Sequence, residues 1–166
     1  NRCNLKCPVC FANAAAAGYT YEPTREQIYE MLRNLRRNTP FAPVALQFSG
    51  GEPTIREDLP ELVEKAKELG FEHVEVNTNG VRISQSVRYI QELMKTGVDT
   101  FYLQFDGLTD DVYRKTRGVP LLDVKMKAIE NARKARLDSL VLVPTVVKGI
   151  NDQVIGGIIH FAAKNY

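Results

Sequence analysis

The side chains of this sequence with the most distinctive chemistry are three cysteines near its start. Cys3, Cys7 and Cys10 follow a C-x3-C-x2-C pattern, and the sequence contains no other cysteine. Three thiolates can hold three irons of a cubic iron–sulfur cluster and leave the fourth iron open. An open iron can bind a substrate or cofactor, whereas a fully ligated cluster mostly carries electrons. The pattern therefore favours a cluster with one free coordination site.

Two other kinds of cysteine chemistry fit the pattern less well. Structural zinc sites use four ligands, usually in two spaced pairs, and this sequence has no second pair. A disulfide framework in a small secreted chain expects an even number of cysteines, and this chain has three. Zinc and unrelated thiols stay open as alternatives. Closely spaced thiols also favour a reducing compartment, which we expect to be the cytoplasm.

The composition is that of an ordinary globular domain. The 166 residues are 44% hydrophobic and 25% charged, which is enough for one domain with a buried core. A net charge of +2 without a clustered basic face argues against a nucleic acid partner. No apolar run approaches the roughly 18 residues of a membrane span, so we expect no transmembrane segment.

Helical and extended segments alternate along the sequence. A capping box at residues 24–27 precedes an apolar helix face at Ile28, Met31, Leu32 and Leu35. Further helices are predicted over 58–70, 84–96, 109–115 and 122–136, and from residue 151 or 152 onward. Buried strands are predicted over 44–48, 73–76, 100–105 and 140–147. This alternation predicts an α/β fold with a parallel sheet covered by helices.

A polar segment lies at the carboxyl end of each predicted strand. Ser49–Pro53 follows the first, residues 77–80 follow the second, Gln104 and Asp106-Gly107 end the third, and Pro144-Thr145 lies late in the fourth. Each segment alone is consistent with an ordinary turn, and Asp106-Gly107 is a common turn dipeptide. In a parallel sheet, however, these ends meet at the edge where such folds bind ligands. The sequence therefore predicts a binding site at this edge.

The cysteine segment and the polar segment after the first predicted strand together resemble the signature of the radical S-adenosylmethionine (SAM) enzymes. Residues 3–10, Cys-Asn-Leu-Lys-Cys-Pro-Val-Cys, resemble the family's cluster loop. About forty residues later, Ser-Gly-Gly-Glu-Pro resembles its methionine-binding segment. The resemblance covers nearly the whole chain. One position departs from it: many members have an aromatic residue where this chain has Val9, and here Phe11 follows the third cysteine instead.

The resemblance implies a partial (β/α)6 TIM-like barrel. Residues 1–166 would form a core domain that holds strands two to five, with the first and sixth strands outside the segment. Cys3, Cys7 and Cys10 would ligate a [4Fe–4S] cluster, and SAM would be the second cofactor. The resemblance assigns the SAM contacts to Gly50, Gly51, Glu52, Asn77, Asn79, Gln104, Arg117, Thr145 and Val146.

The activity implied is reductive cleavage of SAM to a 5′-deoxyadenosyl radical, which abstracts hydrogen from an unactivated carbon. Reduced ferredoxin or flavodoxin would donate the electron, in a reducing and anaerobic cytoplasm. The run Cys-Pro-Val-Cys-Phe-Ala most resembles tetraether-lipid synthases and radical methyltransferases, which implies carbon–carbon bond formation or methylation on a lipid or small molecule. A peptide- or cofactor-maturation enzyme is an alternative. Non-catalytic rivals are an iron–sulfur electron carrier, a zinc-stabilised binding module and a scaffold that has lost catalysis.

Overall fold

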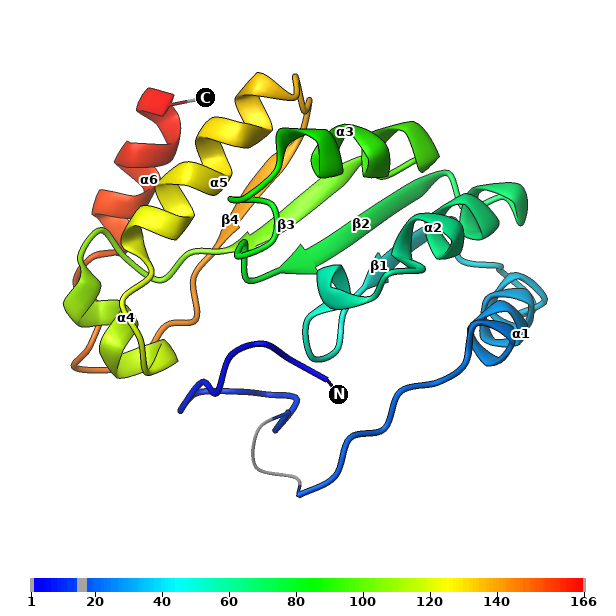
Figure 1. The fold of residues 1–166 in the computed structure, drawn as a ribbon, viewed down its shortest axis with the longest axis horizontal. Coiled ribbons are helices and arrows are strands. Elements are labelled where there is room, and N and C mark those ends of the chain that lie inside the picture. Colours follow the sequence, from blue (N-terminus) through cyan, green and yellow to red (C-terminus); the bar gives the residue numbers. More distant parts are fainter. Residues whose placement is uncertain (1, 15–17, 166) are drawn as a thin grey trace.

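The computed structural model describes residues 2–14 and 18–165; Asn1, residues 15–17 and Tyr166 lie outside the described residues. Strands and helices alternate as the sequence predicts (Figure 1). The strands are β1 (Ala45–Phe48), β2 (His73–Thr78), β3 (Thr100–Gln104) and β4 (Leu140–Val143). The helices are α1 (Arg25–Arg36), a short 3-10 helix η1 (Pro53–Ile55), α2 (Leu59–Glu68), α3 (Val87–Thr96), α4 (Asp110–Arg117), α5 (Leu122–Lys134) and α6 (Ile155–Asn165).

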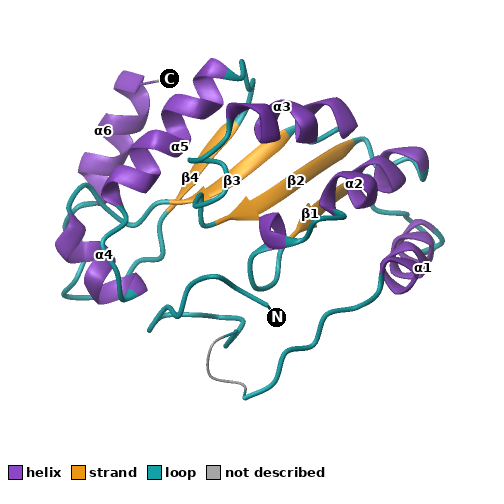
Figure 2. Cartoon of the chain, viewed as in Figure 1, coloured by secondary structure: helices purple, strands orange, loops and turns teal. Residues whose placement is uncertain are grey.

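The four strands form one parallel sheet in the order β1-β2-β3-β4. Each strand therefore pairs with the next one along the chain. A doubly wound sheet instead reverses its strand order at a switch point, whereas a barrel adds strands in sequence. Helices α2, α3 and α5 lie along one side of the sheet (Figure 2). The predicted class, a parallel segment of a TIM-like barrel, is confirmed.

The two faces of the sheet differ in polarity because side chains alternate along each strand. The face under the helices is apolar and includes Val74, Val76, Phe101, Leu103 and Phe105, all fully buried. These residues pack with the apolar stripe of α2, whose Leu59, Val63 and Ala66 are also buried. On β1 and β2 the opposite face is polar: Gln47 donates to Glu75 at 2.9 Å, and His73 contacts Glu75 at 3.2 Å.

Local signals in the sequence explain most of the helix boundaries. The predicted capping box is present. The side chain of Thr24 accepts from the backbone amide of Gln27, and the side chain of Gln27 accepts from the backbone amide of Thr24. Gly97 ends α3 with φ of 113°, a left-handed conformation that glycine adopts without strain. In the described part of the chain, no helix combines the length and the apolar character needed to cross a bilayer.

Several predicted features need correction. β2 continues to Thr78 instead of ending at residue 76, and the last helix begins at Ile155 instead of residue 151 or 152. The fourth strand ends at Val143 instead of residue 147, because Pro144 has no amide hydrogen and the Thr145 amide donates to Asp106 at 2.9 Å. The third helix begins at Val87 instead of residue 84, since Ser86 accepts the capping bond from Tyr89. The apolar face of α1 is only partly covered, with Met31 50% exposed, because α1 lies at the margin of the sheet beyond α2 (Figure 1).

The turn after β2 depends on glycine at position 80. Gly80 has φ of 83°, and a Cβ there would lie 2.6 Å from Cδ1 of the buried Leu103. We expect Gly80→Ala to destabilise the fold by about 2 kcal/mol or more, from backbone strain plus overpacking. Urea denaturation of the protein measures this. Gly156→Ala is the control, because α6 has open space there and alanine favours a helix; equal stability of both variants would contradict the argument.

Candidate functional site

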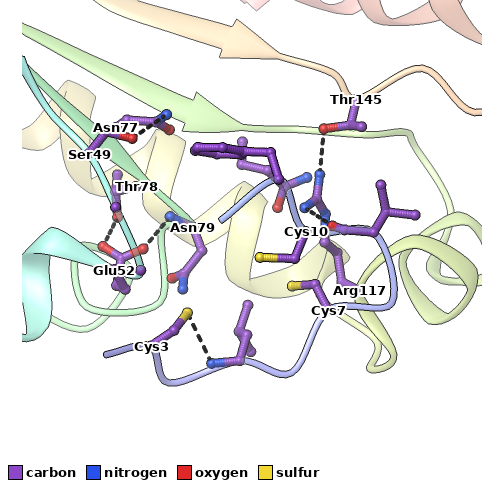
Figure 3. A pocket seen from close by; sticks show the side chains of 16 residues that line it. Cys3, Cys7, Cys10, Ser49, Glu52, Asn77, Thr78, Asn79, Arg117 and Thr145 are labelled. Atoms are coloured by element: carbon purple, nitrogen blue, oxygen red, sulfur yellow. Dashed lines mark hydrogen bonds between the residues drawn. The ribbon is translucent and has the colours of Figure 1, made fainter. Parts of the chain in front are cut away.

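The carboxyl ends of the strands and the cysteine segment enclose one cavity of about 420 Å³ (Figure 3). The structure brings together almost every residue that the sequence singled out. Its lining includes Cys3, Cys7, Cys10, Gly50, Gly51, Glu52, Asn77, Asn79, Gln104, Arg117 and Thr145. Val146 is the exception: it does not line the cavity, and its side chain is 56% exposed. Thr78, from the predicted polar segment 77–80, also lines it, and so do Leu5 and Phe11, for which the sequence predicted no role.

Hydrogen bonds fasten the cysteine segment to the edge of the sheet. At its start, the Glu52 amide donates to the Arg2 carbonyl at 2.9 Å. In the middle, Nδ2 of Asn79 donates to Oδ1 of Asn4 at 2.7 Å. Near the third cysteine, Arg117 donates to the Val9 carbonyl at 3.3 Å. The thiols are therefore held over the strand ends instead of projecting freely into solvent.

The three thiols provide a donor set that fits an iron–sulfur cluster. All three are free of disulfides and face the same cavity; Cys3 and Cys7 are partly buried, and Cys10 is exposed. Burial raises the pKa of the Cys3 thiol, and the hydrogen bond from the Leu5 amide partly opposes this. Among the described residues, no three His, Cys, Asp or Glu side chains converge on one metal ion. A cubic cluster is less demanding, because each thiolate binds a different iron.

Glu52 follows Gly50 and Gly51 in the chain, and its carboxylate is buried and hydrogen-bonded. Its side chain, only 4% exposed, accepts from the amide and hydroxyl of Thr54, from the Thr78 hydroxyl at 2.7 Å and from the Asn79 amide at 2.7 Å. Three of those bonds end on Oε1 and one on Oε2, so Oε2 keeps acceptor capacity. The carboxylate thus fixes the end of β2, and Gly50, Gly51 and Glu52 all line the cavity.

We expect Glu52→Gln to destabilise the protein by about 1–3 kcal/mol, since an amide nitrogen would then face donors from Thr54, Thr78 or Asn79. The free energy of unfolding in urea measures this effect. Glu57→Gln, an exposed change a few residues away, is the matched control and should leave it unaltered. If the two variants were equally stable, the Glu52 hydrogen bonds would not be holding the edge.

A buried ion pair supports the other side of the cavity. Asp106 is fully buried and binds Arg117 through two bonds, 2.6 Å to Nε and 2.9 Å to one terminal nitrogen. Burial alone would raise the pKa of Asp106, but the guanidinium and the Thr145 amide lower it overall. Arg117 also donates to the Thr145 hydroxyl at 2.9 Å. Figure 3 shows its guanidinium beside Cys7 and Thr145.

From the sequence, Asp106 is expected only as part of a common turn, and its ion pair is not predicted. The available signal was its position directly after a buried strand, at the same edge as the other polar segments. A second missed residue is Lys125, whose Nζ donates to the Asn79 carbonyl and to Gln104 beneath the cavity wall. Asn77, by contrast, lies at the predicted edge, although inside β2 instead of after it, and donates to the Ser49 hydroxyl at 3.4 Å.

A parallel half-barrel whose strand ends face three free thiols defines a class of protein: a barrel core that binds its cofactors at the carboxyl edge. Comparison with known proteins gives the family. The model of the Radical SAM superfamily matches residues 1–162, and the chain belongs to this superfamily. Membership implies SAM and an iron–sulfur cluster, and it confirms the prediction of a radical SAM enzyme at the level of the family.

Curated relatives include a 7,8-dihydro-6-hydroxymethylpterin dimethyltransferase of Methanocaldococcus jannaschii, 52% identical over 99% of this chain and 32% of the relative. A probable GTP 3′,8-cyclase of Thermococcus kodakarensis is 32% identical over 98% of this chain and 50% of the relative. The chain thus spans about a third to a half of these relatives. The dimethyltransferase is consistent with the radical methyltransferase-like group that the cysteine motif predicted.

Solved structures agree with the fold. SuiB of Streptococcus suis, bound to S-adenosylmethionine, superposes with a TM-score of 0.70 at 20% identity, over 98% of this chain and 36% of that chain. Methylornithine synthase (PylB) gives a TM-score of 0.69 at 18% identity, over 98% of this chain and 47% of that chain. At this low identity the likeness supports the barrel architecture alone.

Proposed function

We propose that this chain binds a [4Fe–4S] cluster through Cys3, Cys7 and Cys10 and binds SAM at the open iron. The observation that carries the proposal is the single cavity lined by all three thiols and by the polar ends of the strands. When bound, the cluster and SAM supply one-electron cleavage of a carbon–sulfur bond, and the resulting 5′-deoxyadenosyl radical abstracts hydrogen from an unactivated carbon.

The residues of the chain bind and orient the nucleotide in this proposal. Gly50, Gly51 and Glu52 offer acceptors to the methionine amino group, and the Glu52 carboxylate also holds the end of β2. Arg117, held by Asp106, supplies a cation for the carboxylate or ribose. Asn77 and Asn79 face the sulfonium and ribose region, with Gln104 beside them.

The adenine end of the nucleotide has a less complete set of contacts. The fifth barrel strand, which is β4 here, is expected to meet the base through backbone at Thr145 and Val146. Thr145 lines the cavity, whereas Val146 does not. We therefore propose that Val146 contacts the base only through its backbone. Phe11 lines the cavity mouth and is 86% exposed. Many family members have an aromatic residue at the position of Val9. In this chain we propose that the ring of Phe11 provides the apolar surface for the base instead.

For the reaction of the whole protein we propose methylation or carbon–carbon bond formation at an unactivated carbon of a small molecule or lipid. The 52% identity to a pterin dimethyltransferase supports methylation of a small molecule, and the cysteine motif supports the wider group that includes lipid-forming enzymes. A peptide- or cofactor-maturation enzyme is the alternative, and the 32% identity to a probable GTP 3′,8-cyclase supports a small-molecule substrate other than a lipid. Reduced ferredoxin or flavodoxin is the proposed electron donor, in a reducing, anaerobic cytoplasm.

Anaerobic reconstitution of the full-length protein with iron and sulfide tests the proposal. We expect about four irons per primary centre, from the family's cluster type, a spectral change on adding SAM, and 5′-deoxyadenosine after reduction. A cluster that ignores SAM and yields no 5′-deoxyadenosine would identify an electron carrier. Zinc without iron or sulfide in anaerobically purified protein would identify a binding module. Unchanged activity after loss of a cysteine would identify a scaffold.

A further inference from the structure

Lys125 lies buried below the cavity, and the proposed function gives it no role. The residue is on α5 and its exposed fraction is 0%. Lysine is almost never fully buried unless its nitrogen is paired. Here Nζ donates to two uncharged oxygens, the Asn79 carbonyl at 2.5 Å and Oε1 of Gln104 at 2.8 Å. Burial, assisted by the nearby charge of Arg117, lowers the pKa of Lys125 to about 7.

These two bonds join the ends of neighbouring strands. Asn79 directly follows β2, and Gln104 is the last residue of β3. Both residues line the cavity, so Lys125 connects two parts of its wall from behind. One more contact fixes the lysine itself: its Nζ lies 5.8 Å from the ring centre of the buried Tyr113.

The lysine also determines which way the Gln104 amide points. The charged lysine nitrogen has donors and no acceptor, so in that form it holds Oε1 of Gln104 toward itself and Nε2 away. Among the described residues, Nε2 of Gln104 is the buried side-chain polar atom without a hydrogen-bond partner. Buried polar groups almost always have partners, and an orphaned donor in a cavity wall marks a place for an acceptor.

We propose that Lys125 is a positioning residue for the cofactor: it fixes Gln104 so that Nε2 donates to an oxygen of bound SAM. The inference rests on the proposed function, because it takes the acceptor to be the carboxylate or a ribose oxygen of SAM. Lys125 touches no ligand itself. A purely structural lysine would instead stabilise the strand ends, and its effect on the Kd of SAM would not depend on whether Gln104 is present.

A double-mutant cycle in the intact, reconstituted protein separates these roles. The variants are Lys125→Met, Gln104→Ala and the double variant, and the Kd of labelled SAM is measured by anaerobic equilibrium dialysis. Methionine keeps the length and apolar stem of lysine but removes its donors. We expect each single variant to bind SAM about tenfold more weakly, the loss of one well-made hydrogen bond. The double variant should bind no more weakly than either single one.

Lys127→Met is the matched control on the same helix. Lys127 is half exposed and pairs with Glu130, so its loss should leave the SAM Kd and the iron content unchanged. Wild-type affinity in Lys125→Met would overturn the inference, and so would fully additive losses in the double variant. If wild-type protein holds its cluster but never binds SAM, the proposed function fails, and the inference fails with it. If only the Lys125 result fails, the proposed function stands.

Gln104→Glu keeps the test decisive if Lys125→Met does not fold. A carboxylate still accepts from Lys125, but it cannot donate to a ligand oxygen as Nε2 does. We expect this variant to retain its fold and iron while binding SAM at least about tenfold more weakly. Unaltered SAM affinity would overturn the inference.

Discussion

Replacing Cys7 with alanine is expected to remove the cluster and abolish SAM cleavage. The chain has three cysteines, and all of them line the cavity. With two thiolates left, two irons of the cluster would lack a protein ligand instead of one. After anaerobic reconstitution of the full-length variant, iron and sulfide should fall to background. No 5′-deoxyadenosine should form when dithionite and SAM are added.

His160→Ala is the matched control for this experiment. His160 is an exposed residue of α6, and histidine is a common metal ligand. Because it lies outside the cavity lining, its loss should leave iron content and 5′-deoxyadenosine formation at wild-type levels. A Cys7→Ala variant that kept its iron and still cleaved SAM would show that the cluster is held elsewhere. The parallel variants of Cys3 and Cys10 should behave like Cys7→Ala.

Much of the site could be predicted because it depends on local sequence and on one rule of parallel sheets. Asn77 is the second-last residue of β2 and Gln104 is the last of β3, and the alternation of helices and strands alone places those ends together. The cysteines carry their chemistry in their spacing. The fourth strand was the weak point: an apolar run predicts a strand through Val147, but Pro144 and the Asp106 bond end it earlier.

The residues that sequence reasoning missed act through partners that are distant along the chain. Asp106 binds Arg117 and Thr145, which belong to α4 and to the segment after β4. Lys125 reaches back from α5 to Asn79 and Gln104. The helical periodicity of α5 places Lys125 on the buried face, but it cannot show which hydrogen-bond acceptors lie opposite its nitrogen. Such pairings follow from tertiary packing and not from a local pattern.

Asp106→Asn is expected to destabilise the protein by about 3–5 kcal/mol, the cost of breaking one side of a buried ion pair. The side chain of Asp106 is fully buried, and that of Arg117 is 10% exposed. Asparagine would leave the guanidinium without a counter-charge. It would also present an amide nitrogen to donors, because the carboxylate accepts from the Thr116 hydroxyl at 2.8 Å and from the Thr145 amide. Urea denaturation at neutral pH measures the loss.

The pH dependence of this loss follows from the lowered pKa of Asp106. A carboxyl whose folded pKa lies below its unfolded value of about 3.9 binds fewer protons in the folded state, so it stabilises the fold above that pH. The contribution disappears as the pH falls through the folded pKa. The difference in stability between wild type and Asp106→Asn should therefore be constant near neutrality and shrink below about pH 4.

Asp111→Asn is the matched control for both measurements. Asp111 also pairs with an arginine, Arg114, but its side chain is 84% exposed. Exposed ion pairs contribute little, so this variant should unfold like wild type at every pH. Asp106→Asn should in addition loosen the cysteine segment, because Arg117 is the residue that donates to the Val9 carbonyl. Wild-type stability of Asp106→Asn at neutral pH would mean that the buried pair does not support this wall of the cavity.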